Sequence, residues 1–169
     1  KVSDEALAGI AYESGKVTKN AVFVAACGAN ADGHDFIPEA LKKGASLVLC
    51  EKRDAYEVYK AAYPERCFAL AGSSRRALAL ASAAFFGYPA EKLTLIGLTG
   101  TKGKTSTSFM IKSLLEAAGH PTGLIGTTGI YYGTQYEYID NSTPESFELH
   151  RIFAAMVQSG IRYCVMEVS

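Results

Sequence analysis

The sequence predicts an α/β protein in which helices cover parallel sheets, and three observations support this fold class. Short apolar segments typical of buried strands alternate along the chain with helical segments. A glycine-rich loop at 99–103 joins one such strand to a helix. A segment containing Gly87 and Pro89, at 86–92, divides the 169 residues into a small N-terminal α/β domain, 1–89, and the first part of a second parallel-sheet domain, 90–169.

The N-terminal domain is predicted to alternate three strands with three helices. The first strand, 21–26 (AVFVAA), is followed by a loop rich in Gly, Asn and Asp. A helix then begins near Ile37, with Pro38 in its first turn, and stops at Gly44. Ser73 or Ser74 caps the last helix of the domain. The remaining elements are strands at 45–50 and 66–71 and helices at 55–62 and 73–86.

The second domain is predicted to run strand, loop, helix and strand, with further elements after them. The strand covers 93–98, the helix 104–118 and the next strand 122–126, and Gly119 ends the helix. The tyrosine-rich segment YYGTQYEYI indicates an exposed hairpin. Thr143 then caps a helix with Pro144 at its first position, and a last strand covers 163–168. Apolar residues in that helix recur at helical spacing, at Leu149, Ile152, Phe153, Met156 and Val157.

Composition and charge exclude several classes of protein. The 17 basic and 17 acidic residues balance, which removes the electrostatic argument for nucleic acid or an acidic membrane surface as partner. Apolar runs are too short for membrane insertion, and the first residues do not resemble a signal peptide. The four cysteines lie beside apolar residues, which predicts buried, reduced thiols in a cytoplasmic protein. The three histidines have no partner at metal-ligand spacing and are predicted to lie at the surface.

The loop TGTKGKTS, 99–106, has the chemistry of a phosphate site. Such a site needs backbone N–H groups that point one way, a helix N-terminus behind them, and a cation. Lys104 can reach the β- and γ-phosphates of a nucleotide, and the hydroxyl of Thr105 can bind Mg²⁺. An ordinary glycine turn is the alternative, but Gly-Lys-Thr-Ser at a strand-to-helix junction favours phosphate. The usual pattern would place its first glycine at 98, where this chain has Leu98.

This loop resembles the ATP loop of the Mur ligase family, T-G-T-x-G-K-T-[ST], in which the first glycine comes two residues later, here at Gly100. The segments DGHDFIPEALKKGASLVL and FFGYPAEKLTLIGLTGTKGKTS also resemble the family. The segment from N-S-T-P-E at 141 to M-E-V-S at 166–169 is similar to its UDP-N-acetylmuramoyl-tripeptide synthetases (MurE). Nearly the whole chain takes part in the resemblance, although the loop alone also fits folylpolyglutamate synthetases.

The resemblance implies an N-terminal domain that binds a UDP-substrate and a second domain that is part of a P-loop-type ATPase. Such enzymes use ATP and Mg²⁺ to phosphorylate the free carboxylate of UDP-N-acetylmuramoyl-L-alanyl-D-glutamate. The amine of a diamino acid, L-lysine or meso-diaminopimelate, then attacks the acyl phosphate. The expected partners are therefore these small molecules, and a monomer is expected.

The resemblance also assigns residues. The ATP phosphates would be bound by Gly100, Thr101, Lys102, Gly103, Lys104, Thr105 and Ser106. Lys104 and Glu167 would be catalytic, and Thr105 and Glu167 would hold Mg²⁺. The UDP-substrate would be bound by Ser14, Ala29, Asn30, Ala31, Asn141, Ser142, Thr143 and Ser169. Plainer alternatives are a solvated acid at Glu167, a helix cap at Thr143, a solvent-facing Lys102 and a simple turn at 29–31. The family often has arginine where Gly15 follows Ser14, which weakens that assignment.

Two other functions fit parts of the same pattern. One is a related ligase, of the MurF or folylpolyglutamate synthetase type, and the other is a non-catalytic module that binds a UDP-sugar or a nucleotide. The family's carbamylated lysine and its amino-acid-binding domain match nothing in these 169 residues. We therefore expect a fragment of a longer protein that has no ligase activity alone, and the diamino acid stays open.

Overall fold

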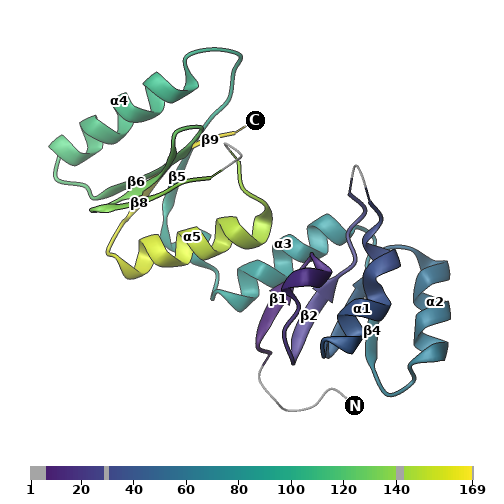
Figure 1. Ribbon diagram of the computed structural model, residues 1–169. Coiled ribbons are helices and arrows are strands. Elements are labelled where there is room, and N and C mark those ends of the chain that lie inside the picture. The colour runs from purple at the N-terminus through teal and green to yellow at the C-terminus, as the bar shows by residue number, and fades with distance from the viewer. Residues whose placement is uncertain (1–6, 29–30, 140–142, 169) are drawn as a thin grey trace. The chain divides into compact units, whose positions relative to one another are not determined.

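The computed structural model describes residues 7–28, 31–139 and 143–168. The chain forms two compact units, Lys1–Phe85 and Phe86–Ser169, each with its own sheet and core. Both units alternate strands with helices, as the α/β prediction requires (Figure 1).

The first unit contains a four-stranded parallel sheet in the order β1-β2-β3-β4. Its strands are β1 (Gly9–Ala11), β2 (Ala21–Val24), β3 (Leu47–Cys50) and β4 (Cys67–Leu70). Its α-helices are α1 (Ile37–Lys42), α2 (Arg53–Ala62) and α3 (Ser74–Phe85), and its 3₁₀ turns are η1 (Ser14–Lys16) and η2 (Gly33–Phe36). All the elements predicted for this half are present, and β1, η1 and η2 are additional.

Helices on both faces bury the middle of this sheet. Phe23 of β2 and Val48 of β3 pack with Ile37 and Leu41 of α1, while tyrosines of α2 border the same cluster. Helix α3 contacts β1, β2 and β3 and buries Leu78 (Figure 1). Because both faces are covered, every residue of β2 is buried, which explains why its sequence is a continuous apolar run.

The second unit contains a five-stranded sheet in the order β5-β9-β6-β7-β8. Strands β5 (Thr94–Leu98), β9 (Tyr163–Glu167) and β6 (Thr122–Gly126) are parallel. Strands β7 (Gly129–Tyr132) and β8 (Gln135–Glu137) continue the sheet antiparallel, so the predicted tyrosine hairpin is confirmed. The helical elements are η3 (Pro89–Lys92), α4 (Lys104–Ala117) and α5 (Ser146–Gln158).

Figure 1 shows α4 and α5 on opposite faces of this sheet. Helix α4 contacts β6 and β9, and α5 contributes Ile152, Phe153 and Met156 to the core on the other face. Leu149 and Val157 border this core, which confirms the predicted apolar stripe.

The predicted cap of α5 is wrong. The helix begins at Ser146, and its N-cap residue is Glu145 in an extended conformation. The hydroxyl of Thr143 instead donates to the backbone carbonyl oxygen of Glu167, at 3.1 Å. Thr143 therefore ties the segment before α5 to the end of β9, a contact that the local sequence gives no reason to expect.

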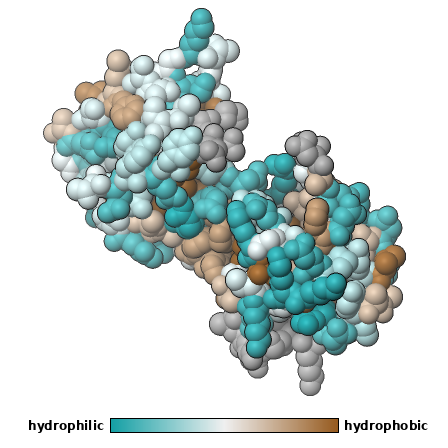
Figure 2. All heavy atoms as spheres, in the orientation of Figure 1, coloured by the Kyte–Doolittle hydropathy of each residue, from teal (hydrophilic) through white to brown (hydrophobic). Residues whose placement is uncertain are grey.

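The surface agrees with the balanced composition. On the face that Figure 2 shows, hydrophilic residues predominate and apolar residues lie among them. Among the helices formed by the described residues, none is both long and apolar enough to cross a bilayer.

Candidate functional site

The glycine loop connects the end of β5 to the first turn of α4. Gly100 and Gly103 have φ values of +143° and +80°, which side chains other than glycine rarely adopt. Gly103 is the N-cap residue of α4 and, because glycine has no side chain, it makes no side-chain capping hydrogen bond. The first N–H groups of a 14-residue helix therefore face the loop, as anion binding requires.

Lys104 is bound to the loop itself. Its Nζ donates to the carbonyl oxygen of Gly100 at 2.7 Å. Lys102 is exposed, which agrees with a side chain that faces solvent, and Ser106 is also exposed. Thr105 is half-buried, and its carbonyl oxygen accepts a hydrogen bond from Ser108 Oγ at 2.8 Å. The ammonium group has three N–H donors, so Lys104 can donate to a phosphate group without giving up all contact with the Gly100 carbonyl oxygen.

Glu167 lies at the end of β9, directly beside the start of this loop. It pairs in register with Leu98, the last residue of β5. Only 1% of Glu167 is exposed, so the alternative of a solvated strand-end acid is wrong. Its carboxylate accepts hydrogen bonds from the N–H of Thr127 at 3.2 Å and from Thr127 Oγ1 at 3.1 Å.

The donor chemistry of these residues fits a magnesium ion. Carboxylate and hydroxyl oxygens are the ligands that Mg²⁺ prefers, and Glu167 and Thr105 supply one of each. A buried carboxylate needs a compensating positive charge. None of the ion pairs between residues that the structure describes includes Glu167.

The predicted substrate residues of the first unit lie in two places. Ser14, in η1, donates its hydroxyl to Glu39 Oε2 at 2.8 Å and accepts from Lys43 Nζ at its carbonyl oxygen, at 3.0 Å. Ala31 is exposed, and its carbonyl oxygen accepts from the N–H of Gly28 at 2.9 Å. The predictions at Ala29, Asn30, Asn141, Ser142 and Ser169 fall outside the described residues.

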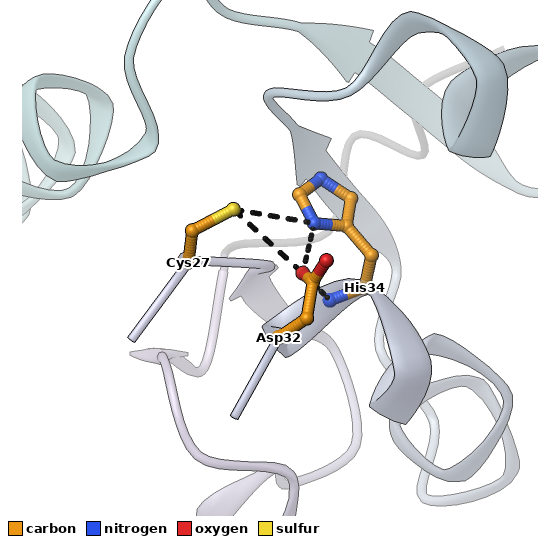
Figure 3. A group of neighbouring side chains, drawn as sticks. All are labelled: Cys27, Asp32 and His34. Atoms are coloured by element: carbon orange, nitrogen blue, oxygen red, sulfur yellow. Dashed lines mark hydrogen bonds and ion pairs between the residues drawn. The ribbon is translucent and has the colours of Figure 1, made fainter. Parts of the chain in front are cut away.

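Three potential metal ligands meet between β2 and η2 in the first unit: Cys27, Asp32 and His34 (Figure 3). His34 Nδ1 lies 2.6 Å from Asp32 Oδ1, and Cys27 Sγ lies 3.7 Å from the same oxygen. Lys52 also forms an ion pair with Asp32. The Lys52 ammonium, followed by the backbone N–H of His34, holds the pKa of the Asp32 carboxyl well below its usual range.

The hydrogen bonds of His34 argue against a metal in this cluster. The backbone N–H groups of Glu51 and Lys52 both donate to His34 Nε2, at 3.0 and 3.2 Å. Nε2 must therefore carry the lone pair, and Nδ1 carries the proton that it donates to Asp32. A metal bound at Nδ1 would move that proton onto Nε2, against two N–H groups. We therefore assign the cluster a structural role.

This cluster corrects two sequence predictions. His34 is 3% exposed, although all three histidines were predicted at the surface, and His150 is half-buried. Cys27 is exposed, although the cysteines were predicted to be buried; elsewhere Cys67 is half-buried, and only Cys50 and Cys164 are buried. Partial desolvation and the Asp32 carboxylate raise the pKa of the Cys27 thiol, so it is a poor nucleophile. The four cysteines are free thiols, as predicted.

Comparison with known families agrees with the geometry of both units. The family model described as "Mur ligase middle domain" matches residues 98–169, which contain the loop and Glu167. The model described as "Mur ligase family, catalytic domain" matches residues 6–84. The chain belongs to the Mur ligase family.

Curated members of this family are similar over almost the whole chain. A UDP-N-acetylmuramoyl-L-alanyl-D-glutamate–2,6-diaminopimelate ligase of Clostridium tetani is 46% identical over 160 residues, which cover 95% of this chain and 32% of that enzyme. The enzyme of the same name from Clostridium perfringens is 43% identical, and the match again covers 95% of this chain and 32% of that enzyme. The chain therefore spans about a third of the length of these Mur ligases.

Solved structures of Mur ligases share the fold. A structure of a UDP-N-acetylmuramoyl-L-alanyl-D-glutamate–2,6-diaminopimelate ligase matches 98% of this chain and 32% of its own, with a TM-score of 0.75 at 20% sequence identity. A MurF ligase from Acinetobacter baumannii matches 99% of this chain and 32% of its own, with a TM-score of 0.61 at 21% identity. These likenesses confirm the α/β fold class.

Sequence reasoning missed two residues beside Glu167. Thr127 donates to its carboxylate, and Gly126 lies against it. The sequence Gly-Thr-Thr-Gly at 126–129, at the end of a predicted strand, could have indicated a tight turn at this place.

Proposed function

We propose that this chain is part of an ATP-dependent amide ligase of peptidoglycan precursor synthesis. In this proposal the enzyme joins 2,6-diaminopimelate to UDP-N-acetylmuramoyl-L-alanyl-D-glutamate. The observation that carries the proposal is the glycine loop at the N-terminus of α4, with Lys104 at its end and a buried carboxylate, Glu167, on the neighbouring strand. The names of the related enzymes supply the substrate class.

The proposed reaction has two steps. The γ-phosphoryl group of ATP passes to the free carboxylate of the UDP-dipeptide, and ADP leaves. The amine of the diamino acid then attacks the acyl phosphate, which releases inorganic phosphate and forms the amide bond. Because no protein nucleophile is needed, the chain's part is to position the reactants and to offset the charge of the phosphates.

Each site residue has a proposed role in this scheme. The amides of Gly100–Ser106 bind the phosphates, and Lys104 neutralises charge on the β- and γ-oxygens. Thr105 and Glu167 hold Mg²⁺, which when bound offsets the negative charge of the phosphates. Thr143 contacts the UDP-muramoyl-dipeptide, and Ser14 and Ala31 contact its uridine part, together with the predicted residues outside the described ranges.

The relatives favour one diamino acid and one reaction over the alternatives. The sequence leaves lysine and diaminopimelate open, whereas the curated relatives described above are named as 2,6-diaminopimelate ligases. Neither of these two relatives has the name of a MurF-type or folylpolyglutamate-type enzyme or of a non-catalytic module. The cytoplasmic location and the monomeric state stay predictions.

Calorimetric titration of the 169-residue chain tests the proposal. We expect binding of Mg-ATP and of UDP-N-acetylmuramoyl-L-alanyl-D-glutamate. The corresponding UDP-tripeptide, the acceptor that a MurF-type enzyme would need, should bind less tightly. Binding of neither Mg-ATP nor the UDP-dipeptide would contradict the proposal. A ligation assay of the complete gene product, with diaminopimelate and L-lysine in equal amounts, tests the choice of amine.

A further inference from the structure

The turn between β6 and β7 encloses the Glu167 carboxylate. Gly126 and Gly129 pair at the ends of the two strands, so Thr127 and Thr128 form a two-residue connection. We propose that Thr127 is a positioning residue, which holds the Glu167 carboxylate in the orientation that binds the divalent cation of the nucleotide. This inference rests on the proposed function, in which Glu167 is a magnesium ligand.

Thr127 holds both oxygens of the carboxylate at once. Its backbone N–H donates to Oε1 at 3.2 Å, and its hydroxyl donates to Oε2 at 3.1 Å. One residue therefore fixes the rotation of the whole carboxylate group. A carboxylate offers about four lone-pair positions, so two remain for other ligands. The hydrogen bonds leave the negative charge of Glu167 in place, and a cation can use it.

Gly126 provides the space for this arrangement. A Cβ atom at Gly126 would lie 2.3 Å from Glu167 Oε1 and 3.0 Å from its Cδ, far inside van der Waals contact. Gly126 is buried and its φ is not positive, so an alanine could adopt this backbone conformation. The steric conflict is therefore with the carboxylate, and any larger residue would displace it.

Two tyrosines hold the second residue of the turn, Thr128. The hydroxyls of Tyr131 and Tyr136 both donate to the backbone carbonyl oxygen of Thr128, at 3.0 and 3.3 Å. Their rings lie 5.1 Å apart, on the paired strands β7 and β8. The hairpin thus anchors the turn, and the turn holds the carboxylate. A rigid support of this kind lowers the entropy that the carboxylate loses when it binds an ion.

The test compares nucleotide binding with and without magnesium in matched variants of the 169-residue chain. Thr127→Val removes the hydroxyl donor, and Thr127→Ser retains it. We expect Thr127→Val to weaken the apparent affinity for Mg²⁺ in the presence of ATP by about 10- to 100-fold, the usual effect of removing a group that orients a metal ligand. Affinity for ATP in EDTA should stay within about twofold, and Thr127→Ser should restore the magnesium dependence.

Thr122→Val is the matched control. It removes a threonine hydroxyl at the start of β6, the strand that leads into the turn. This hydroxyl donates to the His120 carbonyl oxygen at 2.8 Å, away from the turn. We expect this variant to keep the wild-type magnesium dependence. Gly126→Ala perturbs the carboxylate by the independent steric route, and it should weaken magnesium binding in the same direction as Thr127→Val.

Each outcome decides between the two proposals. Wild-type magnesium dependence in Thr127→Val would overturn the positioning role while the proposed function stands. An equal loss in Thr122→Val would also overturn it, because the effect would then be general destabilisation. A wild-type chain that binds ATP without any dependence on magnesium, or does not bind it, would overturn the proposed function and this inference with it.

Discussion

Replacing Lys104 with methionine is expected to weaken Mg-ATP binding about 5- to 30-fold while it leaves the fold intact. A hydrogen bond between an ammonium group and a phosphate contributes about 2–3 kcal/mol. In the free chain the Lys104 ammonium already donates to the Gly100 carbonyl oxygen at 2.7 Å, and weakening that bond as Lys104 turns towards a phosphate costs about 1 kcal/mol. The net contribution is therefore about 1–2 kcal/mol, and each 1.4 kcal/mol changes affinity about tenfold.

Calorimetry with Mg-ATP and urea unfolding measure the two halves of this prediction. Methionine keeps the length of the side chain but removes its charge and its hydrogen bond to Gly100, so the free energy of unfolding should fall by about 1 kcal/mol at this partly exposed position. Lys112→Met, on the same helix and paired with Glu116, is the control and should bind Mg-ATP like the wild type. Unchanged affinity in Lys104→Met would refute the assigned role, and a stability loss above about 2 kcal/mol would refute the claim that Lys104 serves mainly binding.

Three further predictions concern the Cys27–Asp32–His34 cluster of the first unit and the core of the second unit. Asp32→Ala should destabilise the first unit by about 2–3 kcal/mol, most of it from leaving the buried His34 Nδ1–H unpaired, because the half-exposed Lys52 pair contributes at most about 1 kcal/mol. Because the pKa of Asp32 is lowered in the folded chain, this stabilisation is complete above its ordinary pKa of 3.8 and is lost as the pH falls below that value. Urea unfolding should therefore show a smaller difference in stability between Asp32→Ala and the wild type in acid than at neutral pH. Met156→Ala, in the core of the second unit, should cost about 2–5 kcal/mol in urea unfolding, and a cost below about 1 kcal/mol would contradict the packing described. Zinc should not raise the melting temperature through Cys27 and His34, and a rise that Cys27→Ser abolishes would contradict the assigned tautomer.

Much of the fold could be predicted because local patterns carried it. The apolar runs of β2 and β6 follow from burial on both faces of a sheet, and the stripe of α5 follows from helical periodicity. The glycine loop was identified because its backbone conformation and its lysine are both set by neighbouring residues in the chain. The prediction of the α5 cap was wrong because it depended on a distant residue: the Thr143 hydroxyl donates to Glu167, 24 residues away.

The sequence by itself determined the alternation of strands and helices, the glycine loop before α4 and the family resemblance, because each of these depends on patterns within short segments of the chain. Only the tertiary structure decided the surroundings of Glu167 and His34. Strand β9 is inserted between β5 and β6, which brings Glu167 beside Leu98 and within hydrogen-bonding distance of Thr127, 40 residues earlier. His34 is buried because backbone N–H groups at the end of β3 meet its ring. Strand order and such contacts arise from packing between distant segments, and no local pattern records them.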